Sequence, residues 1–182
     1  MRSIRLPGMY LREEDLRKLV GVIEYTPRAR YSYSAGQALS EFLRGLREGR
    51  ILGRLCPSCN RVLVPPRVYC EHCYTQTTEW VEVPGTGRVE SVVVSYIGTA
   101  RERLEKPEII AVIRLDAPGY GRDSFDFAGL FHKLCGVTED DVKSGRVIGL
   151  RVKPRWKPLE LRTGSILDIE CFEPEVVESE RA

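Results

Sequence analysis

Four cysteines in two short pairs constrain this chain more than any other feature. They form the segments Cys56-Pro-Ser-Cys59 and Cys70-Glu-His-Cys73, separated by ten residues. Each C-x-x-C pair can present two thiolates to one metal ion from a tight turn, and two such turns complete a tetrahedral site. The intervening segment, which contains Pro65-Pro66, is long enough for a small hairpin. The spacing therefore predicts a zinc ribbon.

A zinc ion bound by these four thiolates is expected to be structural, with one ion per chain. Four protein ligands leave no open coordination position for a substrate or a catalytic water. The alternatives are two redox-active pairs or two disulfides. A redox motif is expected once, near a βαβ pattern, rather than twice across a hairpin. His72 lies inside the second pair and could replace a cysteine, but four thiolates already satisfy the metal. The expected ligands are Cys56, Cys59, Cys70 and Cys73.

The composition is that of a globular protein. The chain has 182 residues, of which 42% are hydrophobic and 30% charged, and this excludes wholesale disorder. Uncharged apolar runs such as Val92–Ile97 are far shorter than the about 20 residues of a membrane-spanning helix. No apolar secretory segment follows Met1. We therefore expect a cytoplasmic protein with no membrane partner, in which the two C-x-x-C pairs are reduced, metal-bound thiolates rather than disulfides.

Charge is distributed unevenly along the chain. Residues 1–75 contain 13 basic and 7 acidic side chains, whereas residues 76–182 contain 15 and 19. A basic N-terminal half could meet nucleic acid, a phosphorylated cofactor or an acidic protein surface, or it could be an ordinary solvated surface.

Helical signals are confined largely to the N-terminal region. Apolar spacing predicts a short amphipathic helix over residues 12–22, followed by a tyrosine- and arginine-containing arm. A second helix is predicted to start with a capping box formed by Ser34 and Gln37 and to stop at Gly49.

The chain is expected to divide into four parts: an arm with helices (1–50), the ribbon (51–77), a barrel (78–175) and an acidic tail (176–182).

After the second cysteine pair, the hydrophobic pattern changes to a period of two. One short helical turn, Val137–Lys143 with Thr138 as its cap, interrupts the strands. This order predicts a mainly β protein with N-terminal helices, in which a rubredoxin-like zinc ribbon precedes a five-stranded OB-fold barrel. The predicted strands are Thr78–Val83, Gly87–Ile97, Glu108–Asp116, Ser124–His132, Arg146–Arg155 and Ile166–Phe172.

The sequence offers little catalytic apparatus. His132 and Cys135 are three residues apart, but they are interpreted as a surface imidazole and a packed thiol, and Cys171 as a core residue. No nucleophile stands beside a base in a known motif. The sequence therefore argues against an enzyme that acts on its own.

A single-stranded nucleic-acid-binding module is the alternative function. OB barrels bind single strands through aromatic platforms and a basic groove. Phe125 and Phe127 are predicted to share one face, either as such a platform or as part of the core. The net acidic barrel region argues against nucleic acid as a partner, because phosphate neutralisation supplies much of the affinity.

In this order and spacing, the motifs resemble the zinc-ribbon/OB-fold acyl-CoA-associated family, including its archaeal members. The resemblance rests on the segment from Arg54 to Arg67 with its Pro65-Pro66, on Tyr69–Cys73, and on the later turn at Glu139–Val142. It covers roughly residues 37–175.

The resemblance implies an accessory subunit of thiolase-superfamily enzymes. Such a subunit docks on a thiolase or a hydroxymethylglutaryl-CoA synthase, which supplies the catalytic residues, and helps to bind or channel acyl-CoA. CoA phosphates require basic side chains, and the candidates for these contacts are Arg54, Arg61, Arg67 and Arg88.

Overall fold

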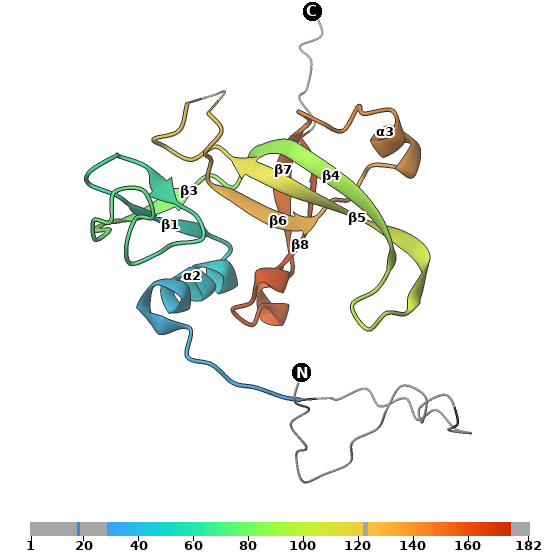
Figure 1. Cartoon of the computed structure of the whole chain (residues 1–182), viewed down its shortest axis with the longest axis horizontal. Coiled ribbons are helices and arrows are strands. Elements are labelled where there is room, and N and C mark those ends of the chain that lie inside the picture. The colour runs from blue at the N-terminus through green and yellow to red at the C-terminus, as the bar shows by residue number, and fades with distance from the viewer. Residues whose placement is uncertain (1–17, 19–28, 122–123, 176–182) are drawn as a thin grey trace, which may run out of the picture. The chain divides into compact units, whose positions relative to one another are not determined.

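The computed structural model describes residue 18 and residues 29–121 and 124–175 (Figure 1). Residues Met1–Ser34 and Ala35–Ala182 form two separate units. The helix predicted over residues 12–22 lies outside the described residues except for Lys18. In the described part of the first unit, Tyr31 and Tyr33 are exposed, with ring centroids 6.1 Å apart.

Helix α2 (Gly36–Glu48) opens the second unit and buries one side through Ala38, Phe42 and Leu46. The predicted start is wrong, because the N-cap is Ala35, whose methyl group cannot accept a hydrogen bond. The predicted end is confirmed. Gly49 adopts a left-handed conformation and donates its backbone N–H to the carbonyls of Gly45 and Leu46.

A three-stranded antiparallel sheet follows directly from α2. Strand β1 (Ile51–Leu55) lies between β2 (Val62–Leu63) and β3 (Trp80–Val83). Both cysteine pairs lie in the excursion between β1 and β3, so this sheet is the base of the ribbon.

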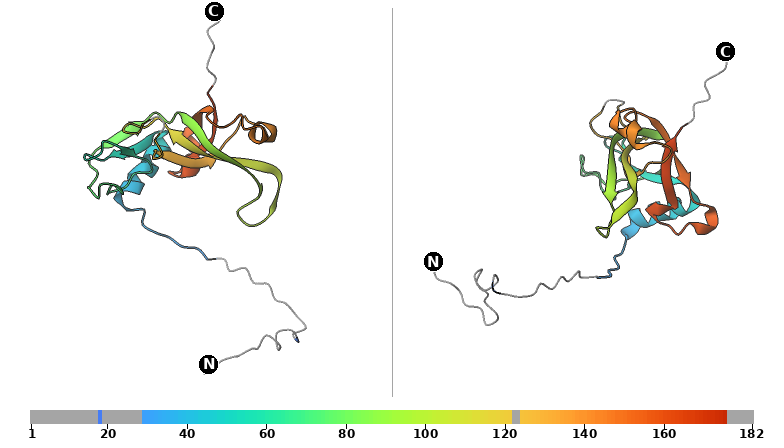
Figure 2. Two further views of the ribbon diagram at one scale, coloured as in Figure 1. Left: turned by 45° about the horizontal axis from the view of Figure 1, so that its top comes forward. Right: turned by 90° about the vertical axis from the view of Figure 1, so that its right-hand side faces the viewer.

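The larger sheet has five antiparallel strands in the order β6-β5-β4-β7-β8. Its long strands are β4 (Gly87–Ile97) and β5 (Arg103–Leu115), and they continue beyond the barrel as a two-stranded hairpin (Figures 1 and 2). The remaining strands are β6 (Gly129–Lys133), β7 (Arg151–Trp156) and β8 (Ile169–Pro174). This is the predicted mainly β architecture, with the five-stranded OB-fold sheet after the ribbon.

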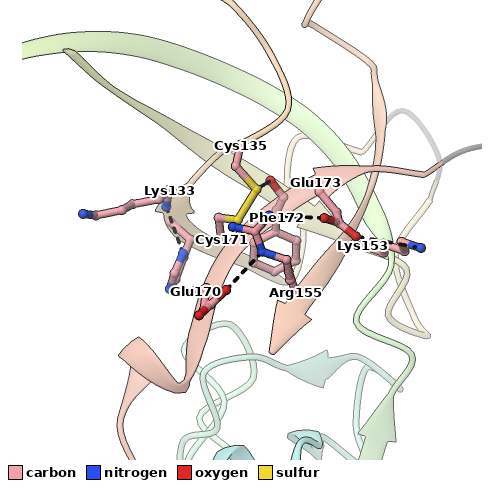
Figure 3. The surroundings of a disulfide bond; sticks show 9 residues. Lys133, Cys135, Lys153, Arg155, Glu170, Cys171, Phe172 and Glu173 are labelled. Atoms are coloured by element: carbon pink, nitrogen blue, oxygen red, sulfur yellow. Dashed lines mark hydrogen bonds and ion pairs between the residues drawn. A yellow bond between two sulfur atoms is a disulfide. The ribbon is translucent and has the colours of Figure 1, made fainter. Parts of the chain in front are cut away.

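The barrel closes where the chain beyond β6 meets β8. Leu134 bridges Phe172 in parallel orientation, and the Cys135 backbone N–H donates to the Phe172 carbonyl at 2.8 Å. A disulfide joins Cys135 to Cys171 at this seam, with 5.9 Å between their Cα atoms (Figure 3). The prediction of two separate packed thiols was therefore wrong, because barrel closure brings together cysteines 36 positions apart.

Turns shorten several predicted strands. Arg146–Leu150 lies in a turn because Gly145 and Gly149 both have positive φ, so β7 starts only at Arg151. Helix α3 (Glu139–Lys143) precedes this turn, and its Thr138 cap is confirmed. Short 3-10 turns η1 (Leu159–Leu161) and η2 (Ile166–Asp168) fill the connection to β8.

One apolar core connects the helix, the ribbon and the barrel. It includes Phe42 and Leu46 from α2, Val62 from β2, and Ile113 and Phe172 from the barrel. Among the described residues, no helix is long and apolar enough to cross a membrane.

Candidate functional site

The two cysteine pairs fold into equivalent turns. The Asn60 N–H donates to the Cys56 carbonyl and the Tyr74 N–H to the Cys70 carbonyl, each at 2.9 Å. Asn60 and Tyr74 have φ values of 57° and 52°. In each turn, the backbone therefore reverses direction through a left-handed residue that directly follows the second cysteine of the pair. This local geometry directs each pair of sulfur atoms to the same side.

The structure brings all four sulfur atoms together. The Sγ atoms of Cys56, Cys59, Cys70 and Cys73 lie within 4.8 Å of one another, and Cys59 and Cys70 are 3.9 Å apart. Zinc–sulfur bonds of about 2.3 Å in a tetrahedron place sulfur atoms about 3.8 Å apart. The cluster therefore fits a zinc ion with four thiolate ligands, and Cys56 and Cys70 are buried. In the described part of the chain, this is the one group of residues placed to bind a metal.

Arg61 supplies positive charge beside the sulfur atoms. Its Nε donates to Cys59 Sγ at 3.2 Å, and its Nη2 lies 3.9 Å from Cys70 Sγ. Burial favours the neutral thiol, but hydrogen bonds from Arg61, Cys56 and Cys73 together outweigh it and lower the pKa of Cys59 to about 6. A hydrogen bond with Cys59 helps Cys73 keep its proton and raises its pKa to about 11. Metal binding would displace the remaining protons.

The same arginine ties the ribbon to the barrel. Its Nη1 donates to Asp126 Oδ2 at 3.2 Å, and His72 Nε2 lies 3.4 Å from that oxygen. Next to this contact, the Val62 N–H donates to the Pro118 carbonyl at 3.2 Å. A Cβ atom on Gly119 would lie 2.1 Å from the Asn60 carbonyl oxygen, so this close approach requires glycine. The first cysteine turn thus packs directly on a barrel loop.

The four candidate arginines do not converge on one site. Arg54 stacks on Trp80 at 4.9 Å and donates to the Thr77 carbonyl at 2.6 Å. Arg61 is 9% exposed and turned toward the thiols and Asp126.

The other two candidates lie elsewhere. Arg67 is exposed and pairs with Glu71 at 2.9 Å. Arg88 lies on β4, directly opposite Arg114 of β5 and Arg151 of β7.

An apolar groove of about 640 Å³ opens between α2, β6 and the loop before β8. Leu39 and Phe131 remain partly exposed at this groove, whereas Phe42 is buried. The full lining is Leu39, Phe42, Leu43, Pro65, Gly129, Leu130, Phe131, Gly164, Ser165 and Ile166.

Asp168 holds the loop that forms one wall of the groove. Its carboxylate is buried and accepts the backbone N–H groups of Thr163, Gly164 and Ser165 at 2.7–3.0 Å. Burial opposes ionisation, but these three donors outweigh it and lower the pKa of Asp168. The wall is therefore fixed by one charged side chain.

The other residues considered for chemistry have structural contacts. His132 is buried rather than at the surface, which corrects the prediction, because β6 turns it toward Phe172. Its Nδ1 accepts the Lys133 N–H, so Nε2 carries the hydrogen that the Ile166 carbonyl accepts at 3.1 Å. Cys135 is in the disulfide.

Phe125 and Phe127 do not form the shared face that was predicted. Both precede β6, which begins only at Gly129, so the alternation of a strand does not apply to them. Phe125 is 96% exposed, whereas Arg114 covers the Phe127 ring at 4.5 Å.

Sequence reasoning missed Asp126, Asp168 and the groove. The partner of Asp126 and the segments that line the groove lie far apart in the chain, and a single sequence does not place them together. The partners of Asp168 are local. One available signal was the S-x-x-D pattern of Ser165 and Asp168, a capping-box variant that the structure contains.

Two family models match adjoining parts of the chain. Residues 44–79 match the model described as "ChsH2, rubredoxin-like zinc ribbon domain". Residues 80–157 match "ChsH2, C-terminal OB-fold domain". A curated relative from Thermomonospora curvata, described as a probable enoyl-CoA hydratase alpha subunit, is 25% identical over 134 residues. The match covers 74% of this chain and 36% of the relative, so this chain spans about a third of that protein's length.

Two solved structures are similar to this chain. The structure described as "Ltp2-ChsH2(DUF35) aldolase" has a TM-score of 0.52 and 22% identity, covering 80% of this chain and 98% of that one. A DUF35-family protein of unknown function from Sulfolobus solfataricus has a TM-score of 0.49 and 29% identity, covering 65% of this chain and 78% of that one.

Proposed function

Because the chain belongs to the zinc-ribbon/OB-fold acyl-CoA-associated family, matched from residue 44 to residue 157, we propose that it is a non-catalytic accessory subunit of an acyl-CoA enzyme complex. The partner proposed is a thiolase, a hydroxymethylglutaryl-CoA synthase, or both. The name of the curated relative, a subunit of an enzyme acting on CoA esters, supports this class of complex.

The proposal assigns zinc a purely structural role. Cys56, Cys59, Cys70 and Cys73 would hold one ion, and four thiolates would leave no coordination position for substrate. Catalysis is therefore assigned to the partner, and the ribbon serves to fix α2 and the barrel relative to each other.

The apolar groove is the observation that carries the CoA part of the proposal. Its volume of about 640 Å³ and its apolar lining suit the acyl or pantetheine part of an acyl-CoA. Arg67 is retained as a phosphate contact because it is exposed and lies two residues from the lining residue Pro65. Arg54 and Arg61 are committed to contacts within the protein.

A mild pull-down of the tagged chain from its native host, after nuclease treatment, tests the proposal. Mass spectrometry should identify a thiolase or a hydroxymethylglutaryl-CoA synthase in stoichiometric amount. The purified complex should then bind acyl-CoA more weakly when Leu39→Asp places a charge in the groove.

Phe125→Asp is the matched control, because it charges an exposed apolar side chain outside the groove lining. Recovery of ribosomal or nucleic-acid proteins alone, or loss of every partner on nuclease treatment, would overturn the accessory-subunit proposal. Equal acyl-CoA affinity in the two variants would reject the groove as the CoA site.

A further inference from the structure

A second pocket, with a volume of about 320 Å³, lies beside the Cys135–Cys171 disulfide that Figure 3 shows. Both cysteines line this pocket, together with Lys133 and Arg155, whose side chains are each half-exposed. The pocket shares no lining residue with the apolar groove. Its volume is at the lower end of the range of about 300–1,000 Å³ that small-molecule sites occupy. A small molecule from solvent can therefore reach the disulfide.

The two sulfur atoms of the disulfide differ in their surroundings. Cys171 is 4% exposed within β8, whereas Cys135 is half-buried in the loop after β6, so Cys135 is the more accessible target for an attacking thiol. Arg155 of β7 lies directly opposite Cys171 in the strand register, and the two side chains share a face of the sheet. A neighbouring cation favours a thiolate, and exchange is faster when the leaving sulfur is a stabilised thiolate. The pocket thus offers Cys135 for attack and Cys171 as the leaving group.

Two ion pairs at the pocket indicate the kind of thiol that it accepts. Arg155 Nε donates to Glu170 Oε2 at 3.1 Å, and Lys133 pairs with Glu108. All four side chains line the pocket, which therefore contains two cations and two carboxylates. A zwitterion can meet both signs, with its carboxylate on a cation and its ammonium group on a carboxylate. An amino-acid thiol combines this charge pattern with the small size that the pocket requires.

We propose that this pocket is a thiol–disulfide exchange site for a small zwitterionic thiol. The thiolate attacks Cys135 Sγ and forms a mixed disulfide, while the Cys135–Cys171 bond breaks and its electron pair leaves on Cys171 Sγ. A second thiol molecule attacks the mixed disulfide, which releases the symmetrical small-molecule disulfide and leaves both cysteines reduced. The protein gains the two electrons that the two thiols lose. Because backbone contacts between the Leu134–Cys135 segment and Phe172 also close the seam, the barrel stays folded in both states.

Exchange of the purified full-length chain with L-cysteine tests the site. After anaerobic reaction and an acid quench, intact-mass spectrometry should show the oxidised chain plus one molecule of cysteine, and peptide mapping should place the adduct on Cys135. The neutral thiol 2-mercaptoethanol is the matched probe. Each rate is divided by the rate of the same thiol with hydroxyethyl disulfide, which corrects for intrinsic nucleophilicity. By this ratio cysteine should react about fivefold faster, because half-exposed charges give modest ion-pair energies.

A charge variant tests the role of the leaving sulfur. Arg155→Gln should slow the exchange about tenfold, because the Cys171 thiolate loses its neighbouring cation. Lys153→Gln is the matched control, since it removes a cation that pairs with Glu173 on the same two strands but outside the pocket lining. It should react as the wild type does. Both oxidised variants should keep the wild-type melting temperature, which separates an effect on exchange from an effect on folding.

The adduct and the rates can each contradict the proposal. A Cys135–Cys171 bond that stays intact in excess cysteine would overturn it, and so would adducts found only on Cys171 or on the ribbon cysteines. Equal ratios for the two thiols would reject the zwitterion, and a wild-type rate in Arg155→Gln would reject the assigned leaving group. A chain purified with both thiols free enters the same cycle from cystine, and failure to form the Cys135 adduct would again overturn the site. None of these outcomes depends on acyl-CoA binding, so the test stands apart from the proposed function.

Discussion

The side chain of Asp168 holds in place the loop that forms one wall of the apolar groove. Its carboxylate is buried and accepts three backbone N–H groups of the loop that forms one wall. Asp168→Asn replaces one acceptor oxygen by a donor, so at least one N–H loses its partner. We expect the free energy of unfolding at pH 7 to fall by about 2 kcal/mol in chemical denaturation.

The pH dependence of this loss follows from the lowered pKa of Asp168. A carboxyl whose pKa is lower in the folded state stabilises the fold above its unfolded pKa of about 3.9. That stabilisation is lost as pH falls through the folded value. The difference between wild type and Asp168→Asn should therefore be constant near neutrality and shrink below about pH 4. Glu160→Gln, at an exposed position nearby, is the control, and an equal loss there would contradict the assignment.

At the scale of elements, the Cys135–Cys171 disulfide reinforces the seam between the end of β6 and β8. Because it joins positions 36 residues apart, chain-entropy arguments give a stabilisation of about 3–4 kcal/mol. The double variant Cys135→Ser/Cys171→Ala should still fold, because backbone hydrogen bonds also close the seam, but with unfolding free energy lower by about that amount. Denaturant titration measures this.

Lys133→Ala is the control for the disulfide variant. It removes a surface ion pair with Glu108 close to the same seam, and such pairs contribute less than about 1 kcal/mol. A double variant no less stable than Lys133→Ala would show that the disulfide does not hold the barrel closed.

Elements with strong local patterns were predictable. Strand β4 has the predicted bounds, because residues 87–97 are rich in β-branched side chains between glycine turns. The start of α2 was not predictable in this way, because Ser34 offers a capping side chain one residue before the N-cap position that the fold uses. Strand β7 was overextended, because turns at Gly145 and Gly149 use residues whose composition also suits a strand.

The candidate site also has parts that the sequence predicts and parts that it does not. The spacing of the four cysteines shows which side chains can meet, because each pair lies within one turn. The groove has no such local signal, because its lining extends from Leu39 to Ile166 and exists only after α2 packs beside β6. The role of Arg61 was equally hidden, because its partner Asp126 is 65 positions away.

For the whole molecule, the shared core predicts that ribbon and barrel unfold together. The two tryptophans of the chain report on the two parts separately, with Trp80 in β3 and Trp156 in β7. Trp156→Phe leaves a ribbon reporter and Trp80→Phe a barrel reporter. Each variant should show one thermal transition, with its chelator-treated form melting at a lower temperature, because bound metal stabilises the fold. The downward shift should be the same in both reporters, since Val62 of the ribbon packs in one core with Ile113 of the barrel.

Two further variants connect this shift to the metal ligands. Cys70→Ser should lose zinc and reproduce the effect of the chelator, whereas His72→Ala should keep about one zinc per chain if the metal has four thiolate ligands. A barrel reporter that keeps its melting temperature after zinc loss would contradict coupling through the shared core. Retention of zinc by Cys70→Ser, together with loss by His72→Ala, would instead assign the histidine as a ligand.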